Sequence, residues 1–207
     1  MNIVLVRHGE TDYNRDGRMY GHAQVALNQR GHTQAAAVAH RLRTTAFSAI
    51  YASDLIRAVQ TAAAIAEYQS VPVNYEPALR EQHVGDWEHL TIPEVQLRFP
   101  QHYADYTADP AYTAYTNGES FAMLQHRAYT SLRAIMSNHQ PTDTLCIVCH
   151  GGTINALICA VLELDIKHHR KLWVDNCSLT TVRITDTQTH LIGLNDHTHL
   201  AHMEQKQ

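Results

Sequence analysis

The chain begins, after Met1 and Asn2, with the apolar run Ile3-Val4-Leu5-Val6 and continues as Arg7-His8-Gly9-Glu10-Thr11. An unbroken apolar run of this length is typical of a β-strand covered on both faces, as in a parallel sheet between helices. A second run, Leu145-Cys146-Ile147-Val148-Cys149, is followed by His150-Gly151-Gly152. We therefore predict two buried strands, each followed by a histidine and a glycine.

Helix and strand patterns alternate around these two runs. Asn28 can cap a helix to about residue 43, in which Ala35, Val38, Ala39 and Leu42 recur at helical spacing. Further helices are expected after Ser53 and Asp54, which can cap one of them, after Ser120, and after Gly152. Further strands are expected at residues 49–52, 71–75, 178–185 and 190–194. The alternation predicts an α/β fold with a mostly parallel sheet and an antiparallel ending.

The stretch from about residue 81 to residue 117 interrupts this alternation. It holds three prolines and four tyrosines, Tyr103, Tyr106, Tyr112 and Tyr115. We interpret it as a lid-like insertion over one edge of the sheet, within a single domain formed by residues 1–207. The tyrosines either contact a ring or sugar in the substrate or pack the insertion itself.

Composition excludes several classes of protein. The 207 residues are 44% hydrophobic and 17% charged, as in a globular domain, and the net charge of −4 favours neither nucleic acid nor an anionic membrane as a partner. No apolar run reaches the roughly 18 residues of a membrane helix, and the apolar N-terminus is too short for a signal peptide. Four cysteines without an export signal predict reduced thiols in a cytoplasmic protein.

Cysteine and histidine patterns argue against a metal site. Cys146 and Cys149 have the C-x-x-C spacing, but on a strand their side chains point to opposite faces. The chain has 16 histidines, whose tight pairs, His168-His169 and His197-x-His199, lack a nearby framework of cysteines or carboxylates. We expect no metal and no cofactor. The histidines other than His8, His22, His89 and His150 are expected on the surface, with a fraying tail after Asp196.

Two arginines and two histidines are expected at one end of the sheet. Arg7 and His8 follow the first strand, and His150 follows the second, where backbone N–H groups of the next helix attract anions. Arg57 falls in the first turn of a helix, the end that the helix dipole makes unfavourable for a cation. Either these groups bind a phosphate dianion, or Arg7 is a surface residue and Arg57 pairs with Asp54.

These motifs, in their order, resemble those of the histidine phosphatase superfamily, branch 1, the phosphoglycerate mutase-like group. The resemblance covers residues 3–195 and rests on Arg7-His8-Gly9-Glu10-Thr11, Ser53-Asp54-Leu55-Ile56-Arg57-Ala58, Gly118-Glu119-Ser120 and His150-Gly151-Gly152. It implies a three-layer α/β/α sandwich. It further implies that His8 is a nucleophile that forms a phosphohistidine, with Arg7, Arg57 and His150 around the phosphoryl group.

The same resemblance assigns roles to residues that spacing alone does not select. Asn14 matches an asparagine that touches phosphate, and Glu81 matches the carboxyl group that serves as acid and then as base. Without the resemblance, Glu81 reads equally well as the ion-pair partner of Arg80.

Candidate phosphate- and substrate-binding residues also include Gly21, His22 and Gly151. This chain departs from the family pattern near the expected pocket mouth, where Gln24, Ala26 and His89 replace the usual Asp, Pro and Gly.

Three functions fit such a site. The segment from 90 to 117 holds a single basic residue apart from histidine, Arg98, so it gives little support to a highly anionic bisphosphate. We therefore predict a phosphatase acting on a small phosphorylated metabolite. The alternatives are a cofactor-dependent phosphoglycerate mutase and a protein that only binds a phosphorylated ligand.

Overall fold

Two parallel strands, β1 (Asn2–Arg7) and β4 (Thr144–Cys149), lie side by side in the middle of a six-stranded sheet. The computed structural model describes residues 1–201, and within them the strand order is β3-β2-β4-β1-β5-β6. The other strands are β2 (Ala49–Ala52), β3 (Val73–Tyr75), β5 (Leu179–Ile184) and β6 (Thr189–Asp196). β1 to β4 pair in parallel, whereas β5 pairs antiparallel with β1, and β6 antiparallel with β5. The predicted sheet, with its antiparallel ending, is confirmed.

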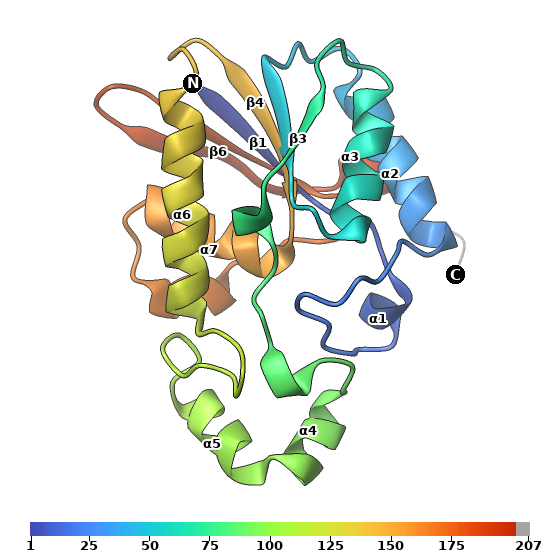
Figure 1. Cartoon of the computed structure of the whole chain (residues 1–207). Coiled ribbons are helices and arrows are strands. Elements are labelled where there is room, and N and C mark those ends of the chain that lie inside the picture. Colours follow the sequence, from blue (N-terminus) through green and yellow to red (C-terminus); the bar gives the residue numbers. More distant parts are fainter. Residues whose placement is uncertain (202–207) are drawn as a thin grey trace.

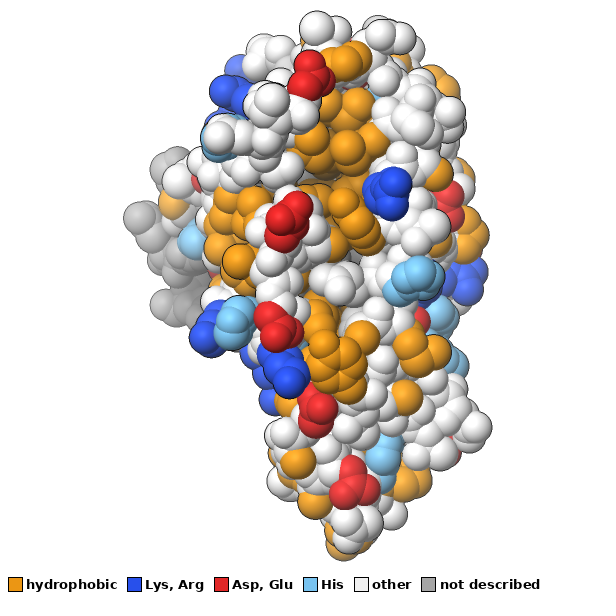
Figure 2. Space-filling view, turned by 90° about the vertical axis from the view of Figure 1, so that its left-hand side faces the viewer, with side chains coloured by type: hydrophobic (Ala, Val, Ile, Leu, Met, Phe, Trp, Pro, Cys, Tyr) orange, Lys and Arg blue, Asp and Glu red, His pale blue; other side chains and the backbone are white. Residues whose placement is uncertain are grey.

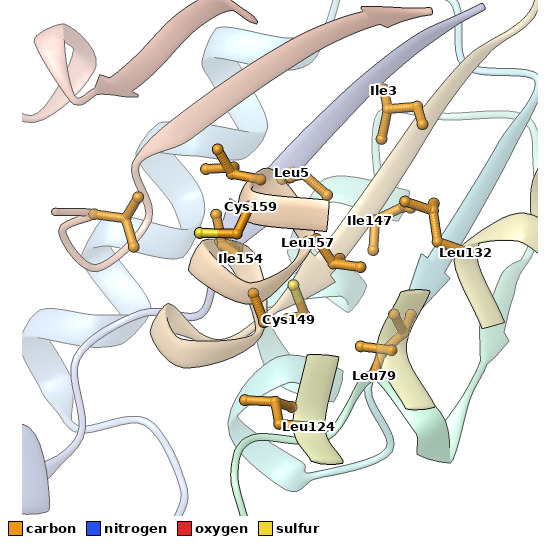
Figure 3. Close-up of a cluster of buried hydrophobic side chains, with 14 of the residues drawn as sticks. Ile3, Leu5, Leu79, Leu124, Leu132, Ile147, Cys149, Ile154, Leu157 and Cys159 are labelled. Carbon is orange, nitrogen blue, oxygen red and sulfur yellow. The ribbon is translucent and has the colours of Figure 1, made fainter. Parts of the chain in front are cut away.

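Helices cover both faces of this sheet (Figure 1), so the three-layer architecture is also confirmed. The first layer contains α2 (Gln29–Leu42) and α3 (Ile56–Ala66), and the second contains α6 (Phe121–Ser137) and α7 (Gly151–Val161). Successive side chains of β1 alternate between the layers, because strand residues have a period of two. Ile3 and Leu5 join the cluster against α6 and α7 shown in Figure 3, and Val4 and Val6 join the one against α2 and α3.

The cysteines follow the same alternation. Cys146 lies in the α2/α3 cluster and Cys149 in the α6/α7 cluster, so the two thiols are on opposite faces, as predicted. All four cysteines are free and buried, and burial raises the pKa of the Cys146 thiol to about 12. A redox or metal-binding pair at this C-x-x-C is therefore excluded by its geometry.

Short helices connect these elements. They are α1 (Asp12–Arg15), η1 (Pro77–Leu79), η2 (Gly85–Trp87), η3 (Ile166–Lys171) and η4 (Thr198–Leu200). The predicted caps of α3 are wrong, because its N-cap is Leu55 and neither Ser53 nor Asp54 caps it. Gln24, from a distant loop, instead accepts a hydrogen bond from the Ile56 N–H at 2.9 Å.

The insertion holds α4 (Ile92–Arg98) and α5 (Pro100–Ala108) and has a hydrophobic cluster of its own around Trp87. It extends beyond the carboxyl ends of β1 and β4, at the bottom of Figure 1. Tyr106 and Tyr115 pack edge-on against Trp87 at centroid distances of 5.3 and 4.9 Å. Most of the insertion's aromatic content therefore fills its interior, although Tyr112 is exposed.

Figure 2 shows the side of the molecule that faces left in Figure 1, where hydrophobic side chains are exposed mainly in the upper half. β6 is the outermost strand at its end of the sheet, and it exposes Ile192 and Leu194. Between residues 1 and 201, no helix combines the length and the apolar character that crossing a membrane requires.

Two expectations about histidines and the C-terminal segment need correction. His169 is buried and stacks on Phe121 with ring centroids 3.8 Å apart, so it is not a surface residue. The segment after Asp196 does not fray over its described part, because Leu200 is buried in the α2/α3 cluster. His202 lies outside the described residues.

Candidate active site

His8 lies directly beyond β1, and its side chain is buried. Its Nδ1 is 2.7 Å from the carbonyl oxygen of Gly9. Because a carbonyl oxygen only accepts, Nδ1 carries the proton and Nε2 keeps a free lone pair. Burial, reinforced by the charges of Arg57 and Arg7, holds the pKa of His8 well below its usual value. The imidazole is therefore neutral near pH 7, the form that acts as a nucleophile.

Arg57 and His150 form a buried pair beside it. The Arg57 Nε–H donates to Nδ1 of His150 at 3.2 Å, and its two terminal nitrogens donate to the carbonyl oxygens of Gly21 and Ala23. Since Nδ1 of His150 accepts, the proton is on Nε2, which donates to the Ser53 hydroxyl at 2.8 Å. The rings of His8 and His150 are 5.1 Å apart, and burial and the Arg57 charge lower the pKa of His150.

The guanidinium group of Arg7 has one nitrogen bound to the protein backbone and another nitrogen without a partner among the described residues. Its Nη1 donates to the Val174 carbonyl at 2.7 Å, whereas its Nε is buried and has no hydrogen-bond partner within residues 1–201. A Cβ on Gly151 would lie 3.4 Å from that Nε, so Arg7 sits against the N-terminus of α7. An unpartnered cationic donor beside a helix N-terminus suits an anion.

Glu81 is fixed by the same helix. Its Oε2 accepts from the Gly152 N–H at 2.9 Å, and its Oε1 accepts from the Gln82 N–H. A Cβ on Gly152 would collide with this carboxylate. Arg80 pairs instead with Asp54, with Nε to Oδ1 at 2.6 Å. This single ion pair removes both alternative interpretations, because Asp54 is not the partner of Arg57, and Arg80 is not the partner of Glu81.

A pocket of about 220 Å³ is lined by Arg7 and Glu81, whereas His8, Arg57 and His150 are not among its lining residues. Its lining includes four of the predicted residues, Arg7, Asn14, Gly21 and Glu81. Gly151 lies next to Arg7 but is not part of the lining. The pocket is also lined by Arg18, Met19, Tyr20, Gln82, Val84, Tyr115 and Gly152. Gly21 is required there, because its φ is +32° and a side chain would collide with the backbone of residues 82 and 84.

His22 and the departures from the family pattern lie outside this lining. The His22 Nε2 donates to the Glu81 carbonyl at 2.8 Å, and its ring is 4.7 Å from that of His83, so it supports the backbone of Glu81. His89 is exposed, and its Nδ1 is 2.9 Å from the Tyr13 hydroxyl. The structure thus brings together His8, Arg7, Arg57, His150 and Glu81, and places His22 behind them.

Sequence reasoning missed the residues that hold this site from behind. Arg127, in α6, pairs with Glu119 and donates to the carbonyls of Ala78, Arg80 and Glu81. Glu119 could have been identified from the motif Gly118-Glu119-Ser120, to which it belongs. No motif or spacing in the sequence indicated Arg127.

Tyr20 and Asn176 were missed as well. The Asn176 Nδ2–H donates to the His8 carbonyl at 2.9 Å. The Tyr20 hydroxyl is 3.4 Å from Nε2 of His8, and its ring lies 4.4 Å from the guanidinium carbon of Arg57. Both residues come from irregular segments, where no periodic pattern exists to place a side chain.

Comparison with known proteins agrees with this geometry. The model of the histidine phosphatase superfamily (branch 1) matches residues 3–197. The chain is 28% identical to phosphoserine phosphatase 1 of Hydrogenobacter thermophilus, over 97% of this chain and 94% of that protein. It is 32% identical to the adenosylcobalamin/alpha-ribazole phosphatase of Escherichia coli, over 94% and 96%. The solved mycobacterial glucosyl-3-phosphoglycerate phosphatase in complex with VO3 has a TM-score of 0.85 and 30% identity, over 94% and 98%.

Proposed function

The chain belongs to branch 1 of the histidine phosphatase superfamily and is a phosphoric monoester hydrolase, and we propose that His8 is its nucleophile. The observation that carries this role is the fixed tautomer of His8, whose Nδ1 proton is committed to Gly9 while Nε2 is left to attack. Nε2 would displace the alcohol from phosphorus and form a phosphohistidine. Arg7 and Arg57 would neutralise the charge of the phosphoryl group during the transfer.

Glu81 is proposed as the acid and base. In the first step its carboxyl proton passes to the leaving alcohol oxygen, so the P–O bond breaks without forming a free alkoxide. In the second step the carboxylate accepts a proton from water, which attacks phosphorus, and inorganic phosphate leaves His8. The Gly152 N–H and the contacts of Arg127 with the backbone at Glu81 support this role, because they fix the carboxylate beside the α7 N-terminus.

His150 is proposed as a positioning residue in the free enzyme. Its Nδ1 accepts from Arg57 and its Nε2 donates to Ser53, so both ring nitrogens are engaged with the protein. A direct contact of His150 with phosphate, as the family resemblance implies, would require the Nε2–H to exchange Ser53 for a phosphoryl oxygen. Asn14 and Gly21, in the pocket lining, are proposed to contact the substrate.

The chain is proposed to be one domain with a lid-like insertion at about 81–117, whose separate cluster around Trp87 supports that division. A cytoplasmic location is supported by the four free, buried cysteines. A substrate among small phosphorylated metabolites is supported by the relatives, which are named phosphoserine phosphatase, glucosyl-3-phosphoglycerate phosphatase and adenosylcobalamin/alpha-ribazole phosphatase.

The test compares the wild type with His8→Ala on p-nitrophenyl phosphate. Hydrolysis is expected in the wild type and is expected to vanish in His8→Ala, whereas His32→Ala, an exposed position on α2, should match the wild type. Rapid quenching with a ³²P-labelled ester should trap an acid-labile label on the wild type and on His32→Ala, but not on His8→Ala. Unchanged activity in His8→Ala would refute the mechanism. Isomerisation of 3-phosphoglycerate, with 2,3-bisphosphoglycerate present, faster than phosphate release would identify a mutase instead.

A further inference from the structure

The hydroxyl of Tyr20 stands where a phosphoryl group has to arrive. Its oxygen is 3.4 Å from Nε2 of His8. Because the proton of His8 is on Nδ1, Nε2 is the acceptor, and the Tyr20 O–H donates to the lone pair that is proposed to attack phosphorus. Reacting atoms in a near-attack arrangement are about 3–3.5 Å apart, so phosphorus needs the space at the same distance from Nε2. Substrate binding must therefore break this hydrogen bond.

The Tyr20 ring is held on two sides, so its hydroxyl stays close when the bond breaks. The Arg57 guanidinium carbon lies 4.4 Å from the ring centroid, in cation–π contact. The Tyr13 ring meets it edge-on, with centroids 5.7 Å apart. The neighbouring backbone is also fixed, since the Met19 N–H donates to the Leu90 carbonyl at 2.8 Å. Tyr20 lines the pocket between these supports.

Three observations thus meet at one side chain: the distance to the nucleophile, the cation beneath the ring and the position in the pocket wall. We propose that Tyr20 is a further catalytic residue, whose O–H transfers its hydrogen bond from Nε2 of His8 to a non-bridging phosphoryl oxygen when the substrate binds. No proton is transferred in this exchange. The proposal rests on the proposed role of His8 as the nucleophile.

The exchange favours the phosphorylated states over the free enzyme. In the free enzyme the bond is long and joins two neutral groups. A bond from a hydroxyl to an anionic oxygen is shorter, about 2.5–2.7 Å, and roughly twice as strong as a neutral one. Tyr20 therefore contributes more once a phosphoryl group is present, which is the condition for lowering the barrier.

The experiment uses Tyr20→Phe, which keeps the ring over Arg57 and removes only the hydroxyl. The matched control is Tyr68→Phe, a half-exposed tyrosine just past the end of α3 opposite to Arg57. For each protein, kcat/KM on p-nitrophenyl phosphate, the inhibition constant of orthovanadate, the calorimetric affinity for inorganic phosphate and Tm are measured.

Tyr20→Phe is expected to lower kcat/KM, and to weaken vanadate and phosphate binding, by roughly 10- to 100-fold, the usual effect of one hydrogen bond to a charged group. Its Tm and the constants of Tyr68→Phe should match the wild type. A kcat/KM within threefold of the wild type, or a higher one, would overturn the proposal, the latter showing that the hydroxyl only blocks His8. If the wild type itself fails to hydrolyse esters, the proposed function fails. The comparison of phosphate affinities then still decides whether Tyr20 contacts the anion.

Discussion

Arg57 and His150 are 93 positions apart in the sequence, both are completely buried, and the Nε–H of Arg57 donates to Nδ1 of His150 at 3.2 Å. Within residues 1–201, the hydrogen bonds of Arg57 go to this imidazole and to two carbonyl oxygens, and no carboxylate pairs with it. A buried cation without a counter-ion is costly, and burial lowers the pKa of Arg57 accordingly. The site is therefore organised to gain an anion.

Arg57→Lys tests whether catalysis needs the planar guanidinium group with its several donors or only its positive charge. Lysine keeps the charge but cannot reach His150, Gly21 and Ala23 together. We expect kcat/KM to fall at least about 100-fold, as for loss of a preorganised transition-state contact. The free energy of unfolding should fall by about 2–4 kcal/mol, because buried acceptors lose their donors. Urea denaturation and steady-state kinetics measure both. Arg133→Lys, at an exposed position of α6, is the control and should change neither.

The two site histidines predict an acid-sensitive fold. The pKa values of His8 and His150 are held well below 6.5 in the folded chain, so below pH 6.5 the unfolded chain binds protons that the folded chain does not. The free energy of unfolding must then decrease as pH falls from about 6.5 towards the folded pKa values, by up to about 1.4 kcal/mol per pH unit for each histidine.

Urea titrations at pH 7.5, 6.5 and 5.5 measure this slope. His8→Asn, which removes one of the two site histidines, should make the decrease shallower by about one proton. A stability that is constant between pH 6.5 and 5.5 would contradict the low pKa values.

Gly152→Ala should impair catalysis more than folding. The added methyl group would collide with the Glu81 carboxylate, which sits at the start of α7 and can move into the pocket. We expect kcat to fall roughly 10- to 100-fold, in the range of a displaced general acid, with Tm nearly unchanged. Gly193→Ala is the control, since a methyl group there meets no atom within 4 Å. Equal kinetics for the two variants would show that Glu81 tolerates displacement.

His199, near the C-terminus, should support the loop behind His8. The His199 Nε2 donates to the Cys177 carbonyl at 3.0 Å, and the adjacent Asn176 donates to the His8 carbonyl at 2.9 Å. We expect His199→Ala to lower the free energy of unfolding by about 1 kcal/mol, the usual net contribution of one hydrogen bond. A loss of kcat of a few-fold should accompany it. His190→Ala, exposed on β6, should leave both quantities unchanged, and chemical denaturation with kinetics at one pH distinguishes the two variants.

The elements predicted correctly are those with a periodic pattern. The runs at 3–6 and 145–149 predict central strands because strands buried on both faces need unbroken apolar sequence. Once these strands are parallel neighbours, His8 and His150 must emerge together, since Arg7 pairs with Cys149 in the register. The conformation of the loops plays no part in this placement.

The contacts that could not be predicted are set by loops whose conformation depends on distant residues. Gln24 caps α3 and Tyr20 reaches His8 from a loop whose Met19 is hydrogen-bonded to the backbone of Leu90. The pairing of Asp54 with Arg80 likewise joins two loops. It excludes the alternative pairs, Asp54 with Arg57 and Arg80 with Glu81. Sequence position carries no signal for such pairings, because each is satisfied only after the chain has folded.

The cluster around Trp87 is separate from the two clusters on the sheet, so we expect that the segment from about 81 to 117 can be replaced by other sequences. Its large side chains pack mainly on one another, so they can be redesigned without changing the side chains that lie on the sheet. Enzymes with new ester preferences could then be sought by grafting other segments between residues 81 and 117 onto this sheet. The graft must keep Glu81 in place and the backbone bonds that residues 89 and 90 make with Met19.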